Sequence, residues 1–94
     1  MNIFQKGETV IISCSIMDKE GQAVDPVTST KIVISDSAGT EKVASTDMTK
    51  DATGEYHYDF DTSTMTLMGE YKARITATDG TRKSIYDILF KLEL

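Results

Sequence analysis

Residues 55–61, Glu-Tyr-His-Tyr-Asp-Phe-Asp, show the clearest alternation of polar and aromatic side chains in the chain. Successive side chains of a β-strand point to opposite faces, so the pattern predicts a strand with one face buried and the other in solvent. Tyr56, Tyr58 and Phe60 are its predicted buried side chains. Strands of this half-buried kind are typical of antiparallel sheets that pack against a second layer.

The same alternation recurs on both sides of this stretch, and turn residues separate the segments. The other predicted strands are residues 2–5, 8–17, 30–36, 40–48, the stretch after Gly69 and 82–93. The predicted turns include Asp18-Lys19-Glu20-Gly21, Asp36-Ser37-Ala38-Gly39, Lys50-Asp51-Ala52-Thr53-Gly54 and Asp79-Gly80. Short strands at this spacing predict an all-β fold, an immunoglobulin-like antiparallel β-sandwich of about seven strands.

One phase of the alternation supplies the predicted core. Its members outside the opening stretch are Val10, Ile12, Cys14, Ile16, Ile32, Ile34, Val43, Tyr71, Ala73, Ile75, Ala77, Tyr86, Ile88, Phe90 and Leu92. A polar loop after residue 61 carries Met65, Leu67 and Met68, which we expect to close one end of this core. At 94 residues, the chain is predicted to be one domain over residues 1–94.

Composition and charge exclude several classes of partner. The net charge is −5 and no cluster of lysine and arginine appears, which argues against nucleic acid and against anionic membranes. No run of about 18 apolar residues could span a bilayer. The single cysteine, Cys14, leaves no intramolecular disulfide, and the first residues lack a signal-peptide pattern. These features favour synthesis in a reducing cytoplasm, whether the chain is a whole gene product or an excised domain.

The sequence predicts no enzyme and no cofactor. Cys14 is in the buried phase and His57 in the solvent phase, so a nucleophile and base pair is not expected. No cysteine or histidine spacing suits zinc. Acidic residues gather at turns, as at Asp18, Glu20 and Asp25, where a calcium site is the alternative to ordinary turn capping.

Four apolar residues occupy positions where alternation predicts solvent: Ile11, Val33, Ile85 and Leu89. If neighbouring strands gather them into one patch, that patch predicts a protein interface, together with Met65, Leu67 and Met68 of the loop. The alternative is the scattered apolar surface of an ordinary monomer.

Turn and core elements of the chain also form a recognisable series. It runs Phe4-x-x-Gly7-Glu8-Thr9-Val10, Asp18-x-x-Gly21-x-x-Val24-Asp25-Pro26, Ile32-x-Ile34-x-Asp36-x-x-Gly39-Thr40, Met48-Thr49-x-Asp51-x-Thr53-Gly54-x-Tyr56-x-Tyr58 and Gly69-Glu70-Tyr71. The series resembles the macroglobulin-type immunoglobulin-like sandwich of surface-protein modules. It is also similar to short proteins encoded among the structural genes of tailed phages and archaeal viruses.

The resemblance implies a non-catalytic structural or interaction module. The first expectation is a phage virion component (capsid decoration, neck or tail protein), made in the host cytoplasm and binding other virion subunits. It would act as a homo-oligomer or in many copies. The alternative is an adhesion or ligand-binding module of a larger cell-surface protein. The resemblance also implies a tyrosine-corner contact for Tyr71, whose hydroxyl would reach backbone across a loop.

Overall fold

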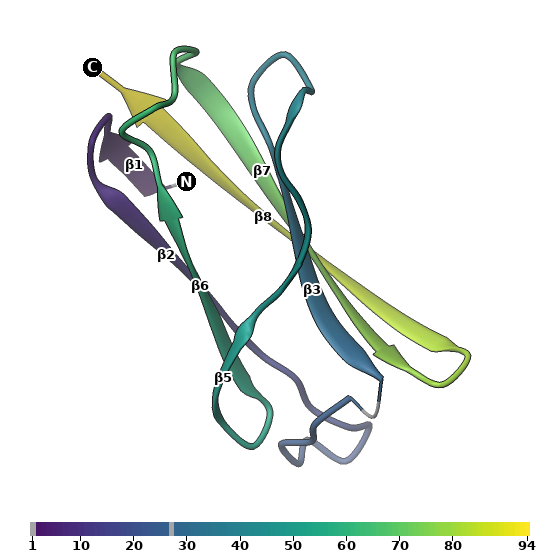
Figure 1. Ribbon diagram of the computed structural model, residues 1–94. Helices are drawn as coiled ribbons and strands as arrows, with labels where there is room; N and C mark the ends of the chain where they lie inside the picture. Colours follow the sequence, from purple (N-terminus) through teal and green to yellow (C-terminus); the bar gives the residue numbers. More distant parts are fainter. Residues whose placement is uncertain (1, 27) are drawn as a thin grey trace.

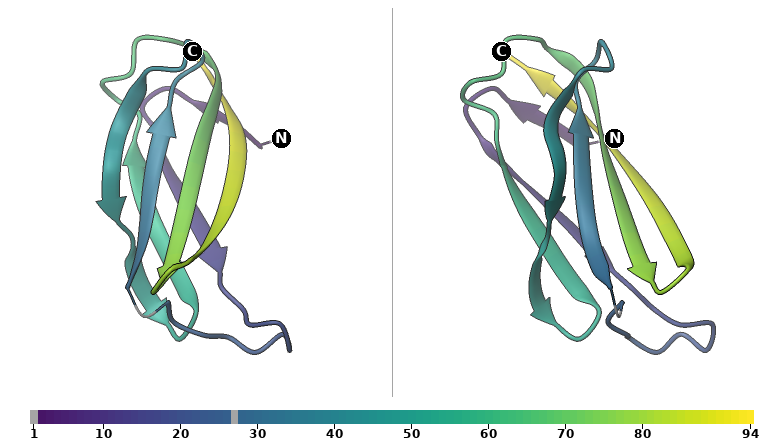
Figure 2. Two further views of the ribbon diagram at one scale, coloured as in Figure 1. Left: turned by 90° about the vertical axis from the view of Figure 1, so that its right-hand side faces the viewer. Right: turned by 45° about the vertical axis from the view of Figure 1, so that its right-hand side comes forward.

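The protein consists of two β-sheets packed face to face, as the computed structural model shows (Figures 1 and 2). The structure describes residues 2–26 and 28–94. Sheet A has the strand order β1-β8-β7-β3-β4, and sheet B has the order β2-β6-β5. The strands are β1 (Asn2–Gln5), β2 (Thr9–Ser15), β3 (Ser29–Ser35), β4 (Glu41–Asp47), β5 (Thr49–Ala52), β6 (Glu55–Asp61), β7 (Gly69–Asp79) and β8 (Arg82–Glu93). The all-β sandwich predicted from the alternation is confirmed.

The described residues form eight strands rather than seven, because a further strand, β5, follows the segment predicted as one strand over 40–48 and is separated from β4 by Met48. β4 belongs to sheet A and β5 to sheet B, so the chain crosses between the layers at this residue. Met48 is buried, and its amide donates a hydrogen bond to the Thr30 carbonyl at 3.0 Å. The turn predicted over residues 50–54 is therefore wrong in its first half, which is strand, and only Thr53 and Gly54 turn the chain.

One strand pair is parallel, so the sandwich is not wholly antiparallel as the sequence predicted. β1 pairs with the end of β8 in parallel, with Asn2 opposite Phe90 and Gln5 opposite Glu93. The cause is the turn after β1, which sends the chain to the other sheet instead of folding it back as a hairpin. Gly7 has φ +103°, and its amide donates to the Thr62 hydroxyl at 2.9 Å.

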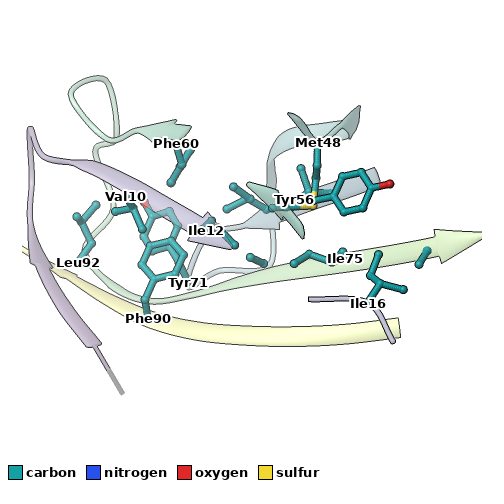
Figure 3. Packing of buried hydrophobic residues seen from close by; sticks show 14 residues of the cluster. Val10, Ile12, Ile16, Met48, Tyr56, Phe60, Tyr71, Ile75, Phe90 and Leu92 are labelled. Atoms are coloured by element: carbon teal, nitrogen blue, oxygen red, sulfur yellow. The ribbon is translucent and has the colours of Figure 1, made fainter. Parts of the chain in front are cut away.

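The core lies between the sheets and contains the residues that alternation placed there (Figure 3). Of the predicted set, Cys14, Val43, Tyr58, Tyr86 and Ile88 are only partly buried; the others are fully buried. Phe60 of sheet B meets Tyr71 and Phe90 of sheet A, with ring centroids 6.1 and 6.2 Å away. Tyr71 stacks on Phe90 at 5.6 Å, so three aromatic rings join the two layers.

The Tyr71 hydroxyl donates a hydrogen bond to the Leu67 carbonyl at 2.6 Å, which is the tyrosine-corner type of contact. It holds the loop between β6 and β7 against the end of the core. Met65 and Met68 of that loop pack partly buried against the core, as predicted, whereas Leu67 points outward and is 39% exposed.

At the opposite end, Asp25 ties the segment between β2 and β3 to sheet B. One carboxylate oxygen accepts hydrogen bonds from the Gly54 amide at 2.9 Å and the Tyr56 hydroxyl at 3.0 Å. The other lies 2.6 Å from Lys50 Nζ. The hydrogen bond to Lys50, followed by that from Gly54, lowers the pKa of Asp25 below its ordinary value. The backbone approaches closely here, since the Ile16 amide donates to the Gly54 carbonyl at 2.7 Å.

We predict that Gly54→Ala destabilises the protein far more than Gly21→Ala. Both glycines have positive φ, which costs an alanine about 1–2 kcal/mol. At Gly21 a Cβ meets open space, whereas at Gly54 it would lie 2.7 Å from the Ile16 carbonyl oxygen, so backbone must move. The two effects together should lower the free energy of unfolding of Gly54→Ala by about 3 kcal/mol. Urea denaturation measures the free energy of unfolding of both variants. An equal loss of stability in the two variants would contradict this prediction.

Asp25→Asn should lower stability at neutral pH and much less in acid. The pKa of Asp25 is lowered in the folded state, so its stabilising contribution is present above the unfolded-state pKa of about 3.9 and is lost as the pH falls through the lowered value. Thermal melts at neutral and acidic pH measure the difference between variant and wild type. Glu20→Gln, in an exposed turn, is the matched control, and a pH-independent difference for Asp25→Asn would refute the assignment.

Candidate interaction surface

The outer face of sheet A carries three of the predicted interface residues. Val33 of β3 lies opposite Arg74 of β7, and Arg74 lies opposite Asp87 of β8. Ile85 and Leu89 flank Asp87 along β8, on the same face of the sheet, and are 57% and 43% exposed.

A charged pair divides this face. Arg74 donates two hydrogen bonds to the Asp87 carboxylate, at 2.8 and 3.0 Å. These bonds lower the pKa of Asp87 and raise the pKa of Arg74. The pair stands between half-buried Val33 and the two residues of β8, so the structure does not join Val33 to Ile85 and Leu89 in one apolar patch.

Ile11 belongs to the other sheet, where it lies opposite Asp59 and is 64% exposed. Sequence reasoning could not place it relative to Leu89. The structure brings the two together around a groove of about 160 Å³, which Phe4 and Ile88 also line. The groove follows the seam where the edge of β2 approaches β1 and β8.

Sequence reasoning missed Ile3. This residue of β1 lies opposite Lys91 in the parallel pair, on the same outer face as Leu89, and is 59% exposed. The available signal was the adjacent pair Ile3-Phe4, because a strand can bury only one of two neighbouring side chains. The Met65, Leu67 and Met68 loop lies elsewhere, at one end of the sandwich, so the predicted residues occupy separate places.

The two residues with the most reactive side chains do not form a catalytic pair. Cys14 lies opposite Tyr56 on the inner face of sheet B, and His57 lies opposite Ser13 on the outer face. His57 Nδ1 is 2.7 Å from an Asp51 carboxylate oxygen. Partial burial, followed by the nearby charge of Glu55, raises the pKa of the Cys14 thiol, which disfavours the nucleophilic thiolate.

The acidic turns use their carboxylates on the protein itself. One Asp18 oxygen accepts hydrogen bonds from the amides of Glu20 and Gln22, both at 2.9 Å, and Asp25 is occupied as described above. Across residues 2–26 and 28–94, no group of three histidine, cysteine or acidic side chains is arranged to hold a metal ion. No helix in that part of the chain could cross a membrane.

A hollow of about 540 Å³ lies between the loop after β2 and the β7–β8 turn. Met17 and Val24 supply apolar lining, and Asp79 and Arg82 supply charges of both signs. The described residues that line it come from the loop after β2 and from β7 and β8 beside their turn.

These features define an immunoglobulin-like β-sandwich module without a catalytic constellation among its described residues. The model of the MG2 domain family matches residues 2–91, and the chain therefore belongs to this family. MG2 domains are generally non-catalytic modules, often found in larger surface proteins of macroglobulin type, and they generally mediate protein–protein interactions. Comparisons with curated proteins and with solved structures gave no match.

We predict that Cys14 alkylates slowly in the native protein. Its thiol is half-buried with a raised pKa, so iodoacetamide at neutral pH should modify it several-fold more slowly than in the urea-unfolded chain. Mass spectrometry follows the reaction. Cys14→Ala combined with Ser13→Cys moves the thiol to the exposed outer face and should react faster. A native Cys14 that reacts as fast as this control would contradict the prediction.

Proposed function

We propose that this MG2 domain is a protein-binding module of a larger surface protein, and that it binds through the β1–β8 side of sheet A. The observation that carries the proposal is the placement of exposed Ile3, Ile85 and Leu89 on two neighbouring strands of one sheet face. Membership of the MG2 family supports the module interpretation.

The composition of this surface fits a binding role. Seven large hydrophobic side chains are markedly exposed among the described residues, and three of them belong to β1 and β8. Lysines surround them, with Lys72 opposite Leu89 and Lys91 opposite Ile3. Protein interfaces combine an apolar centre with a polar rim in this way. Scattered apolar residues of an ordinary monomer would have no reason to share two adjacent strands.

The virion role and virion location implied by the sequence resemblance stay predictions. The family match favours the alternative, an adhesion or ligand-binding module of a larger protein. The genes beside this one would distinguish the surface module from the virion component. Flanking macroglobulin-type modules or a secretion signal in the same reading frame would support the surface module, whereas adjacent capsid or portal genes would support the virion component.

Leu89→Lys should weaken binding of the full-length protein to the protein that it recognises at least tenfold while leaving the fold intact. Leu89 is 43% exposed, so the domain tolerates a lysine there, whereas a partner would have to bury the charge. Leu94→Lys, at a residue 89% exposed beyond the last strand, is the matched control. Binding is measured by biolayer interferometry and folding by circular dichroism. A folded Leu89→Lys variant with unchanged binding would refute the proposed surface.

A further inference from the structure

Most of β8 has a strand neighbour on one side only. β7 pairs with it from Arg82 to Leu92, whereas β1 covers only Phe90 to Glu93 on the other side. Within the described part of the chain, residues 82–89 are therefore the rim of sheet A, which is visible beside the β7–β8 turn in Figures 1 and 2. An open rim leaves every second residue with an unpaired backbone N–H and C=O.

The turn between β7 and β8 determines which residues of β8 have backbone groups that point to the open rim. Gly80 and Thr81 form a two-residue turn inside the closing pair Asp79–Arg82. In such a hairpin the closing residues exchange both hydrogen bonds, and every second pair after them does the same. The backbones of Ser84, Tyr86 and Ile88 thus bond to β7, and the intervening residues, Lys83, Ile85 and Asp87, direct their N–H and C=O groups to the open rim.

This rim lacks three features that protect edge strands from pairing: short length, β-bulges and proline. The opposite rim of sheet A, β4, has register shifts on both sides of Ile34, and β5 in sheet B is four residues long with a shift of its own. β8 pairs with β7 without a shift, and residues 82–89 contain neither proline nor glycine. Regular, unshifted strands are the ones that accept a further strand.

We propose that residues 82–89 pair in antiparallel fashion with the same segment of a second copy of this chain, joining two sheets across a two-fold axis at Ile85. The inference rests on the proposed protein-binding role and deepens it by naming a partner. A two-fold contact of this kind is closed, because each surface is used by the other copy and no further copy can add.

Charge complementarity selects this register. With the axis at Ile85, Lys83 lies opposite Asp87 of the partner subunit, Asp87 lies opposite Lys83 of the partner subunit, and the two Ile85 side chains meet. Opposite charges and paired β-branched residues both stabilise cross-strand contacts. These facing residues are the same ones whose backbone groups point to the rim, so each pair also exchanges two hydrogen bonds.

Registers with the two-fold axis at other residues give less favourable cross-strand pairs. An axis at Tyr86 places Ile85 opposite the carboxylate of Asp87, and an axis at Ser84 places it opposite Lys83. An axis at Asp87 sets two carboxylates against each other and runs into β1, which occupies β8 from Phe90 onward. The open edge of β2, Thr9–Ser15, carries no charged residue and so has no comparable means of selecting a register or a partner.

Hydrogen exchange tests the pairing residue by residue. On raising the concentration from about 10 μM to about 1 mM, a range that covers weak association, the amides of Lys83, Ile85 and Asp87 should exchange more slowly. Those of Ser84, Tyr86 and Ile88, already bonded to β7, are the internal controls and should not change. Absence of added protection at about 1 mM, or protection that falls instead on β2, would overturn the inference.

A matched pair of variants tests the same contact by sedimentation. Ile85→Lys places two lysines face to face at the axis and should weaken self-association roughly tenfold. Ile11→Lys makes the same change at an equally exposed residue of β2 and should have no effect. Loss of association in Ile11→Lys but not in Ile85→Lys would refute the β8 contact. A wild-type domain that binds a different protein in a Leu89-dependent manner, yet never self-associates, would overturn this inference alone and leave the proposed function standing.

Discussion

The unbroken pairing of β7 with β8 is the constraint on which the rest of the molecule depends. It runs from Asp79–Arg82 at the turn to Gly69–Leu92 at the far end without a register shift. It brings Tyr71 and Phe90 together on the inner face, where they stack and meet Phe60 of the other sheet. The same pairing places Ile85 and Leu89 on the outer face. A register change of one residue would exchange these two faces and remove both the core and the surface.

The turn and core elements that identify the family have mechanical roles in this structure. Gly54 permits the close approach of Ile16, Asp25 holds both the Gly54 amide and the Tyr56 hydroxyl, and Tyr71 anchors Leu67. Each fixes the place where a chain segment passes from one sheet to the other or rounds the end of the core. Such elements specify the fold and leave the outer surface free to vary, which is why the family resemblance is informative about architecture and much less so about partners.

The edge strands of the two sheets determine which parts of the surface are suited to binding. β1 covers only the last part of β8, so one rim of sheet A is left regular and open. Exposed Ile85 and Leu89 lie along this rim, and exposed Ile3 lies on the neighbouring β1. The rims at β4 and β5 are irregular or short, and the regular rim at β2 carries no charged residue. Arg74 and Asp87 pair with each other on the outer face of sheet A. Asp18, Asp25 and the Arg74–Asp87 pair stabilise turns and strand pairs within the chain, and the apolar residues beside the open strand, with Lys83 and Asp87 among them, form the part suited to binding.

Alternation in the sequence determined the sandwich fold, nearly all of the core and the exposure of Ile11, Ile85 and Leu89, because side-chain direction along a strand is a local property. Which strands become neighbours is not local. The tertiary structure alone decided that Ile11 and Leu89 share a groove while Val33 is set apart by Arg74, that the chain changes sheets at buried Met48, and that β1 lies parallel to β8. The groove, the sheet crossover and the parallel pair depend on how two sheets pack over one core, and that packing is determined jointly by residues far apart in the chain.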